Sequence, residues 1–299
     1  MGYKNIVRAI QLDDLVKESK KPFIIKKNGT RHELYAGDCI EVLSKLASNS
    51  IDLIITDPPY NIGLDYGDTS VDNLPWGKYY EWSEKWLTQI TRVLSKKGSL
   101  YLMSYPEINA RYLVFLQEKC KLKYRRWITW HYPSNIGHSK KNYTRSQRSI
   151  LFMTKTNEYT FNKENILQPF KNPTDIRIKK LIKSGKKGTG AYDFLTPESI
   201  TNIINTSFDD VARINLLKNV SKDRFTRIKN KKDGHPCQLP IKLLQLFMLV
   251  SSNPRDTVLD PFGGTFTTNR AALDTKRNSI GIEINPQYIK FGLQRLNDG

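Results

Sequence analysis

The stretch "IDLIITDPPYNIG", residues 51–63, decides the fold, because an aliphatic run typical of a buried strand stops at an acid, two prolines and a tyrosine. Pro58 and Pro59 lack backbone N–H groups, so neither a helix nor the pairing of a central strand can continue through them. The stretch therefore predicts a buried strand followed by a rigid loop. That loop presents the carboxylate of Asp57, a fixed carbonyl oxygen and the flat ring of Tyr60.

Strand and helix patterns alternate along the rest of the chain. Residues 32–46 predict a short strand, a turn at Gly37 and Asp38 and an amphipathic helix, and residues 79–105 predict a helix that ends near Gly98 and then an apolar strand. After strand-like sequence at 148–162, the same pattern returns from residue 235 onward. This alternation predicts an α/β fold with a doubly wound, mostly parallel sheet.

One segment interrupts this rhythm. Residues 166–233 carry the loop sequences "KSGKKGTG" and "KNKKDG" and are interpreted as an insertion. The predicted organisation is an N-terminal extension at 1–32, one half of a domain at 33–165, the inserted segment at 166–233 and the second half of the domain at 234–299.

The charge of the chain favours a polyanionic partner. Its 48 Lys and Arg residues against 29 Asp and Glu give a formal net charge of +19. Residues 121–148 hold eight basic residues, no acidic ones and several aromatics, and residues 171–235 hold fifteen basic and seven acidic residues. Basic side chains neutralise phosphates and aromatic rings stack on bases, so nucleic acid is favoured over a membrane surface.

The number and spacing of cysteines and histidines argue against a fold held by disulfides or by a bound metal. The three cysteines are widely spaced, no CxxC pair is present, and there are only four histidines, so neither a disulfide framework nor a zinc site is indicated. No window resembles a signal peptide or a membrane span. We therefore expect a cytoplasmic protein without a metal site and without membrane association.

A second constellation lies near the C-terminus. The predicted strand "TVLD" runs into "PFGGTFTTN", a helix follows, and the next strand ends at Glu283. A glycine-rich turn lets a ligand approach the backbone, and an acid at the tip of the next strand can accept hydrogen bonds from ribose hydroxyls. Ligands of doubly wound sheets bind where the strand order reverses, so Asp57 and Gly264 are predicted to share one nucleoside-binding crevice.

With these residues in view, the sequence resembles the S-adenosylmethionine-dependent amino-methyltransferases of DNA. Their two hallmark motifs stand here as "DPPY" (57–60) and "DPFGGT" (260–265), in the order of the β group. The resemblance implies a Rossmann-like methyltransferase fold with an inserted target-recognition segment. It extends through further blocks, which are "YAGDCIEVL" (35–43), "GSLYLM" (98–103), "SILFMTK" (149–155), "HPCQLP" (235–240) and "GIEINPQYI" (281–289).

The chemistry of amine methylation fits the first motif. The lone pair of an exocyclic amine is delocalised into the base, and acceptors for its two N–H groups would localise that pair on the nitrogen. Asp57 and the Pro58 carbonyl are the predicted acceptors, and Tyr60 would stack on a base flipped out of the duplex. The catalytic residues implied are Asp57, Pro58, Pro59 and Tyr60.

The resemblance also implies a set of cofactor-binding residues. Asp38 has a second interpretation as a helix N-cap, and His235 has one as a residue that only orders a turn. Phe266 stands where the family often has a further glycine, which indicates a turn of different shape or a ring packed beneath it. The implied residues are Asp38, Cys39, Asp57, His235, Gln238, Asp260, Pro261, Phe262, Gly264, Thr265, Thr267 and Glu283.

The predicted partner is duplex DNA, and an aspartate in the first motif favours adenine N6 as the target. Cytosine N4, RNA and a non-catalytic DNA-binding protein are the alternatives. Cys237 in "PCQ" is not interpreted as the nucleophile of a cytosine-C5 enzyme, because that cysteine follows the cofactor motif and Cys237 precedes it. A homodimer and a separately encoded restriction endonuclease are compatible partners. The candidate DNA contacts are Lys140, Lys141, Arg145, Arg148, Arg213, Arg224 and Arg227.

Overall fold

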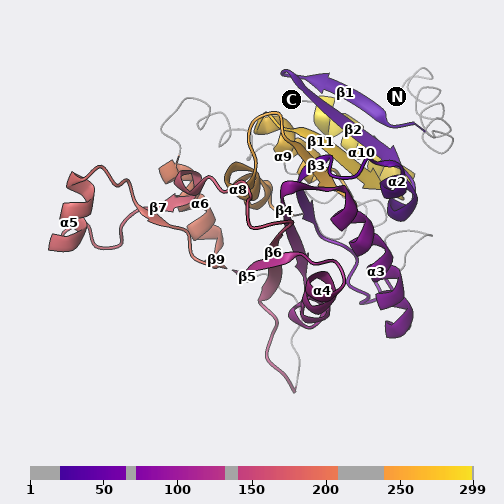
Figure 1. Ribbon diagram of the computed structural model, residues 1–299, viewed down its shortest axis with the longest axis horizontal. Helices are drawn as coiled ribbons and strands as arrows, with labels where there is room; N and C mark the ends of the chain where they lie inside the picture. The colour runs from indigo at the N-terminus through magenta and orange to yellow at the C-terminus, as the bar shows by residue number, and fades with distance from the viewer. Residues whose placement is uncertain (1–20, 65–71, 132–140, 208–238, 298–299) are drawn as a thin grey trace, which may run out of the picture.

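The computed structural model describes residues 21–64, 72–131, 141–207 and 239–297, and these residues form a nine-stranded sheet between two layers of helices (Figure 1). The strands are β1 (Phe23–Lys27), β2 (Thr30–Ala36), β3 (Ile51–Thr56), β4 (Leu94–Ser104), β5 (Lys123–His131), β6 (Gln147–Thr154), β9 (Phe194–Leu195), β10 (Thr257–Asp260) and β11 (Asn278–Glu283). Their order across the sheet is β1-β2-β11-β10-β3-β4-β6-β5-β9.

The sheet is mostly parallel, as the sequence predicts. Strands β2, β11, β10, β3 and β4 run in one direction, whereas β6 is antiparallel to both of its neighbours, β4 and β5. At the other edge β1 pairs antiparallel with β2 in a hairpin. The sheet thus begins at Phe23, ahead of the boundary that we expected at residue 33.

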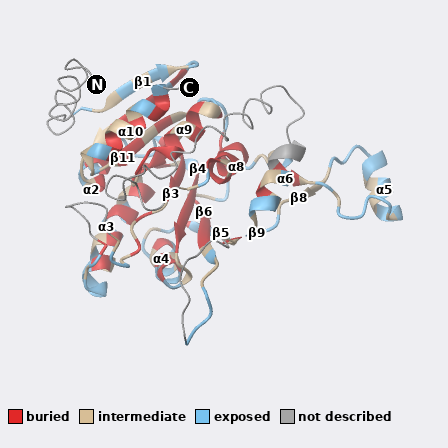
Figure 2. Cartoon of the chain, turned by 180° about the vertical axis from the view of Figure 1, so that it is seen from behind, coloured by how far each residue is buried: buried red, intermediate tan, exposed pale blue. Residues whose placement is uncertain are grey.

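Helices cover both faces of the sheet. Helices α2 (Cys39–Lys45), α3 (Trp76–Val93) and α4 (Pro106–Glu118) share one hydrophobic core with one side of β3 and β4. On the opposite face, α6 (Pro197–Ser207), α8 (Ile241–Ser251) and α9 (Thr267–Asp274) form a second core, and α10 (Pro286–Asn297) packs against β2 and α9. Figure 2 shows the buried residues concentrated in the central strands and the helices against them.

Alternation of side chains along β3 explains this three-layer arrangement. Leu53 and Ile55 point into the core beneath α8, whereas Ile54 points into the core beneath α3, and all three are fully buried. A strand that is apolar on both faces must be covered on both faces. The aliphatic run before Asp57 therefore demands a central strand between two helical layers.

The strand order reverses between β3 and β10. These two strands are direct neighbours, with Leu53 opposite Val258 and Ile54 opposite Leu259. From β3 the chain continues through α3 to β4 on one side, and from β10 it continues through α9 to β11 on the other side. The loops that follow Thr56 and Asp260 therefore leave adjacent strands at the same edge of the sheet.

Helix α3 ends earlier than the sequence pattern suggests. Its last residue is Val93, and Leu94 already pairs with Ile51 at the start of β4, whereas we expected the helix to run to near Gly98. The Leu94 side chain is fully buried. Residues 94–97 thus belong to β4 despite their helical propensity, because β4 pairs with β3 from Leu94 onward. Gly98 lies within the strand.

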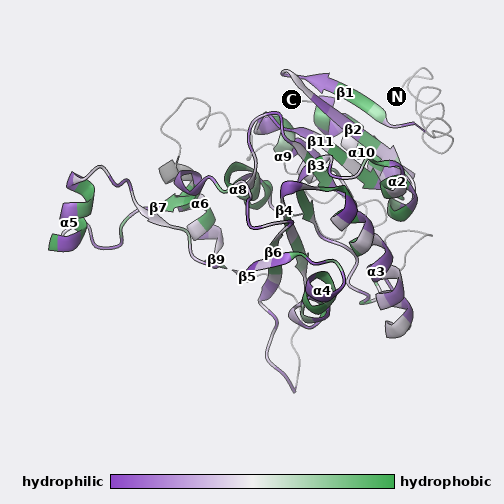
Figure 3. Cartoon of the chain, in the orientation of Figure 1, coloured by the Kyte–Doolittle hydropathy of each residue, from purple (hydrophilic) through white to green (hydrophobic). Residues whose placement is uncertain are grey.

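The first part of the inserted segment, residues 167–190, extends away from the sheet (Figure 1). It contains the two-stranded pair β7 (Leu167–Gln168) and β8 (Thr189–Gly190) and the helix α5 (Ile176–Lys183), which buries none of its residues. A 3-10 turn (Lys163–Ile166) precedes β7. Strand β9 attaches the segment to the main sheet by pairing with β5. Figure 3 shows hydrophilic and hydrophobic residues alternating on α5. None of the helices within the described ranges combines the length and the apolar character that a membrane crossing requires.

Candidate active site

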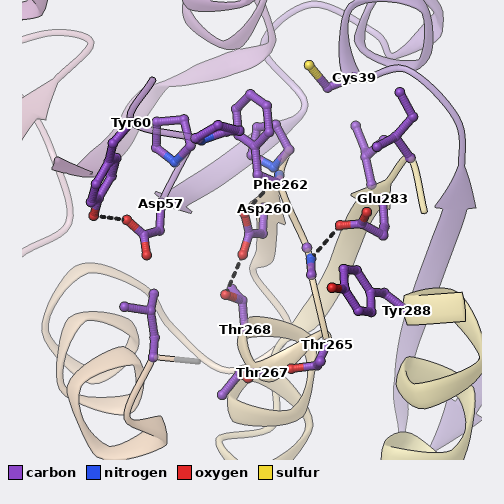
Figure 4. A pocket seen from close by; sticks show the side chains of 18 of the residues that line it. Cys39, Asp57, Tyr60, Asp260, Phe262, Thr265, Thr267, Thr268, Glu283 and Tyr288 are labelled. Carbon is purple, nitrogen blue, oxygen red and sulfur yellow. Dashed lines mark hydrogen bonds between the residues drawn. The ribbon is translucent and has the colours of Figure 1, made fainter. Parts of the chain in front are cut away.

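A cavity opens where the strand order reverses, and both sequence motifs line it (Figure 4). The DPPY loop forms one side, and the glycine turn after β10 forms the other. Of the residues predicted from the sequence, those that line the cavity are Asp38, Cys39, Asp57, Pro58, Pro59, Tyr60, Arg148, Asp260, Pro261, Phe262, Gly264, Thr265, Thr267 and Glu283.

Several predicted residues cannot be placed. His235, Gln238 and Cys237 lie outside the described residues, although Leu239, which follows Gln238, lines the cavity. The candidate DNA contacts Lys140, Arg213, Arg224 and Arg227 also lie outside the described residues.

Asp57 stands at the tip of β3, next to Tyr60. The Tyr60 hydroxyl donates a hydrogen bond to Oδ1 of Asp57. Burial raises the pKa of Asp57 to about 6, and this effect is opposed by the Tyr60 hydrogen bond and by the positive charge of Arg148. The carboxyl group is therefore mostly ionised at pH 7, but its pKa lies only about one unit below that pH.

The chain after Tyr60 is fastened to the start of the segment that leads into α3. Asp72 is fully buried, and its carboxylate accepts hydrogen bonds from the backbone N–H groups of Asn61, at 2.7 Å, and Leu64. The Asn61 side chain in turn exchanges two hydrogen bonds with the backbone of Leu74, at 2.7 and 2.8 Å. These bonds hold the wall of the cavity that Ile62 and Leu64 form.

Glu283 and the glycine turn are joined directly. The backbone N–H of Gly264 donates to Oε2 of Glu283 at 2.8 Å, and the N–H of Asn285 donates to Oε1 at 2.7 Å. Burial raises the pKa of Glu283 to about 7 despite these two donors. The carboxylate lies at the wall of the cavity with lone pairs left for a ligand.

Asp260 plays a structural part in the same turn. It is 4% exposed, and its carboxylate accepts hydrogen bonds from the Phe262 backbone N–H at 3.1 Å and from the Thr268 hydroxyl at 2.6 Å. Burial, together with a smaller effect of the nearby Asp57 charge, raises its pKa to about 7. Asp260 thus ties the strand end to the first turn of α9.

Phe266 adopts a left-handed backbone conformation, with φ of 59°, and its side chain is fully buried. The ring packs beneath the turn, which was one of the two outcomes expected from the sequence. Three glycines make room for it. A Cβ atom would stand 3.0 Å from the ring at Gly263, 2.6 Å at Gly281 and 2.3 Å at Gly292.

Arg295 supports the turn from the C-terminal helix. Its guanidinium is buried and donates hydrogen bonds to the Thr265 carbonyl at 2.7 Å and to the Thr267 hydroxyl at 2.6 Å. Both threonines line the cavity. Sequence reasoning missed Arg295, although a basic residue on the buried stripe of α10, shared with Tyr288 and Gly292, was a usable signal.

Aromatic residues of α3 form a wall behind the glycine turn. The ring of Phe262 contacts Trp82 and Trp86 edge-on, with centroids 5.8 and 5.2 Å away. Trp82 itself lines the cavity, as does Tyr288 of α10. Neither was identified from the sequence. The spacing of Trp82 and Trp86 by one helical turn was the available signal for the wall.

Asp38 serves as the N-cap of α2, which is the alternative interpretation given to it above. Its Oδ1 atom accepts the backbone N–H groups of Ile40 at 2.8 Å and Glu41 at 3.1 Å. Asp38 also lines the cavity, next to Cys39, so capping and ligand contact are compatible. Burial raises the pKa of the Cys39 thiol, which keeps it protonated at neutral pH.

Two of the described basic candidates, Arg145 and Arg148, lie beside the DPPY loop. The Arg148 guanidinium lies over the rings of Tyr60, at 5.2 Å, and Tyr105, at 4.8 Å. Arg145 lies over Tyr105 at 3.7 Å and forms a two-point ion pair with Glu107. Arg148 lines the cavity, whereas Lys141 is exposed at the surface. Within the described ranges, no group of three or more His, Cys, Asp or Glu side chains could hold a metal ion.

The sequence of the chain is similar to those of known proteins. Residues 51–294 match the family of N6/N4 methyltransferases described as DNA methylase. Type II methyltransferase M.HpaI of Haemophilus parainfluenzae is 34% identical over 264 residues, covering 88% of this chain and 74% of that protein. The DNA adenine methyltransferase YhdJ of Escherichia coli (strain K12) is 34% identical over 265 residues, covering 87% of this chain and 81% of that protein.

Solved structures share the fold at lower identity. The PvuII DNA methyltransferase, named as cytosine-N4-specific, aligns with a TM-score of 0.61 at 20% identity, covering 88% of this chain and 86% of that chain. The M1.HpyAVI–SAM complex aligns with a TM-score of 0.57 at 19% identity, covering 89% and 99%. These alignments agree with the mostly parallel sheet described above. Since the family match spans most of its residues, the chain belongs to the N6/N4 family of DNA methylases.

Proposed function

We propose that this protein transfers a methyl group from S-adenosylmethionine to the exocyclic N6 amine of adenine in a specific sequence of duplex DNA. The observation that carries the proposal is the shared cavity, which the DPPY loop and the glycine turn line together. The loop offers acceptors suited to an amine, and the turn with Glu283 offers a place suited to a nucleoside.

The residues on the β10–β11 side of the cavity fit the nucleoside part of S-adenosylmethionine. Glu283 has carboxylate lone pairs for ribose hydroxyls, and Phe262 and Tyr288 offer flat surfaces for adenine. Arg148 is the one basic side chain among the described residues of the lining, which suits a cofactor without phosphate groups. When bound, the cofactor supplies an electrophilic methyl group. The residues proposed to hold it are Asp38, Cys39, Asp57, His235, Gln238, Asp260, Pro261, Phe262, Gly264, Thr265, Thr267 and Glu283.

The DPPY loop is proposed to orient the target amine. Asp57 accepts one N–H of the amine and the Pro58 carbonyl accepts the other, which localises the nitrogen lone pair for attack. Asp57 acts in its ionised form, which prevails above a pH of about 6. Tyr60 stacks on the flipped base, and its ring is supported from the side by Tyr105, whose centroid lies 4.8 Å away.

Adenine is favoured over cytosine by the aspartate at the head of the DPPY motif and by the likeness to an enzyme named as an adenine methyltransferase. The second candidate is cytosine N4, because the structural likeness includes an enzyme named as cytosine-N4-specific. Both bases carry an exocyclic amine, so the same two acceptors serve either of them. The target base must therefore be read from the product.

The DNA is proposed to lie across the basic surface of the chain. The net charge of +19 favours contact with phosphates, and Arg145 and Arg148 stand beside the DPPY loop where a flipped base would enter. Residues 166–233 are proposed to carry most of the sequence recognition. A homodimer and a separately encoded endonuclease are further partners compatible with the family resemblance.

Transfer of labelled methyl groups to duplex DNA tests the proposal. The wild-type protein should label DNA, and Asp57→Ala should reduce transfer on the order of a thousandfold, because an acceptor of the reacting amine is lost. Cys237→Ser serves as the control and should retain substantial activity, since the amine mechanism has no covalent cysteine step. An active Asp57→Ala variant together with an inactive Cys237→Ser variant would contradict the proposal.

A further inference from the structure

Two consecutive prolines limit the backbone hydrogen bonds that can hold the DPPY loop in place. Pro58 and Pro59 have carbonyl oxygens but no N–H groups, so at these two positions the backbone can be anchored only as an acceptor. The Pro59 carbonyl accepts a hydrogen bond from the Tyr79 hydroxyl at 2.6 Å. Among the described residues, no donor reaches the Pro58 carbonyl. Among the described residues, the Pro59 carbonyl is therefore held, and the carbonyl of the preceding residue, Pro58, is left for a ligand.

The Tyr79 hydroxyl is part of a buried chain of hydroxyl groups. The Tyr112 hydroxyl, on α4, donates to it at 2.8 Å and lies 3.0 Å from the Ser83 hydroxyl. Ser83 in turn donates to the Tyr79 backbone carbonyl at 2.8 Å. All three side chains are at most 2% exposed. Buried hydrogen-bond chains of this kind fix the orientation of each member.

Burial also keeps these phenols in the donor state. It raises the pKa of Tyr79 and that of Tyr112 well above their ordinary values, so both hydroxyls stay protonated across the working pH range. A protonated Tyr79 has one hydrogen to donate, and the Pro59 carbonyl receives it. The hydrogen bond from Tyr79 to the loop therefore persists through the pH range in which Asp57 ionises.

Helix α3 connects this anchor to the other half of the site. Three residues beyond Tyr79, Trp82 packs edge-on against Phe262 of the glycine turn, and Trp86 does the same one turn later. One rigid helix thus contacts the DPPY loop through a hydroxyl and the glycine turn through two indole rings. A change at Tyr79 should affect the first contact and leave the second in place.

We propose that Tyr79, backed by Tyr112, is a positioning residue that holds the Pro59 carbonyl inward and thereby turns the Pro58 carbonyl and Asp57 toward the target amine. The proposal rests on the proposed function, because it assigns the reacting amine to these two acceptors. Alignment of acceptors with a reacting nitrogen is sensitive to shifts of less than 1 Å. A hydroxyl that fixes the peptide next to the acceptor is well placed to set that alignment.

Tyr79→Phe is the decisive variant, because it removes the hydroxyl and keeps the ring in the core. Methyl transfer to duplex DNA should show kcat reduced about tenfold to a hundredfold, with the KM for S-adenosylmethionine changed less than about twofold. Tyr112→Phe, one step further from the loop, should show a smaller loss of kcat. Hydrogen exchange of the peptide covering residues 60–64 should be faster in Tyr79→Phe than in the wild-type protein.

Tyr101→Phe is the matched control. Tyr101 is 2% exposed and its hydroxyl lies 2.8 Å from the Ser251 hydroxyl, but it belongs to the core on the opposite face of the sheet. It should lose stability comparably to Tyr79→Phe while kcat and the exchange of residues 60–64 stay at wild-type values. An unchanged kcat in Tyr79→Phe, or an equal loss in Tyr101→Phe, would overturn the proposal.

The exchange measurement separates this inference from the proposed function. If the wild-type protein transfers no methyl groups, the proposed function fails, and the positioning role fails with it. If the wild-type protein is active and Tyr79→Phe leaves both kcat and loop exchange unchanged, only the positioning role fails. Faster exchange with unchanged kcat would show that Tyr79 anchors the loop but does not align the acceptors with the amine. That result would also overturn the proposal.

Discussion

The Tyr60 hydroxyl donates a hydrogen bond to the Asp57 carboxylate three residues earlier, so the ring proposed to stack on the target base is tied to the group proposed to orient its amine. The bond stabilises the ionised form of Asp57 and opposes the effect of burial on its pKa. Arg148 acts in the same direction through its charge. Two neighbours thus keep a buried carboxyl group titrating near pH 6 rather than higher.

The pH dependence of kcat/KM tests this relationship, because it reports the ionisation of the free enzyme. If the ionised form of Asp57 is required, kcat/KM should fall as the pH drops through about 6 and level off above it. Tyr60→Phe keeps the ring but removes the donor, so the pKa should rise and the acidic limb should move to higher pH. Arg148→Gln should shift it in the same direction. A limb unmoved in both variants would show that a different group controls it.

Asp260 predicts a pH effect on stability. Its pKa is raised by burial to about 7, above the ordinary value of 3.8 for an unfolded chain. The folded state therefore binds the proton more tightly, so this group adds stability at low pH that is lost as the pH rises through about 7. Asp260→Asn removes that dependence. The unfolding free energy of the wild-type protein relative to Asp260→Asn should increase as the pH falls from 8 to 5, by on the order of 1 kcal/mol or more. A constant difference across this range would contradict the assignment.

A side chain at Gly292 is expected to destabilise the protein because of Phe266. A Cβ atom at Gly292 would stand 2.3 Å from the Phe266 ring, within a helix that is otherwise suited to alanine. Gly292→Ala should therefore lower the free energy of unfolding by about 1–3 kcal/mol, as overpacked cores do. Gly77→Ala is the control, since Gly77 lies on α3 with nothing within 4 Å of its added Cβ atom. It should be neutral or slightly stabilising in the same denaturant titration. A tolerated Gly292→Ala would mean that the ring does not occupy this space.

The sequence predicted the meeting of the two motifs correctly, because a general rule of doubly wound sheets places loops at the reversal of strand order together. Asp57 follows β3 and Gly264 follows β10, and those strands are neighbours. The place of Arg148 beside Asp57 could not be predicted in the same way. It stands at the start of β6, and only the antiparallel direction of that strand brings its first residues to the edge where β3 and β4 end. Strand-like composition does not reveal direction.

Two other features depend on contacts distant in sequence. The hydrophobic pattern gives no sign that Tyr79 would meet the Pro59 carbonyl twenty residues earlier, because the same pattern is satisfied by any buried ring. The left-handed backbone conformation of Phe266 could not be predicted from the sequence either. Room for its ring is made by three glycines that only folding brings together. Such residues are where tertiary contacts override local propensity.

The identity of the methylated nucleoside tests the central claim most directly. Duplex DNA incubated with the protein and labelled S-adenosylmethionine is digested to nucleosides, which are then separated and identified by mass. The account predicts label in N6-methyladenine, produced by the wild-type protein and nearly absent with Asp57→Ala. Label in N4-methylcytosine would contradict the choice of base while keeping the amine mechanism. Label in 5-methylcytosine would contradict the account as a whole, because no amine would then have reacted at the DPPY loop.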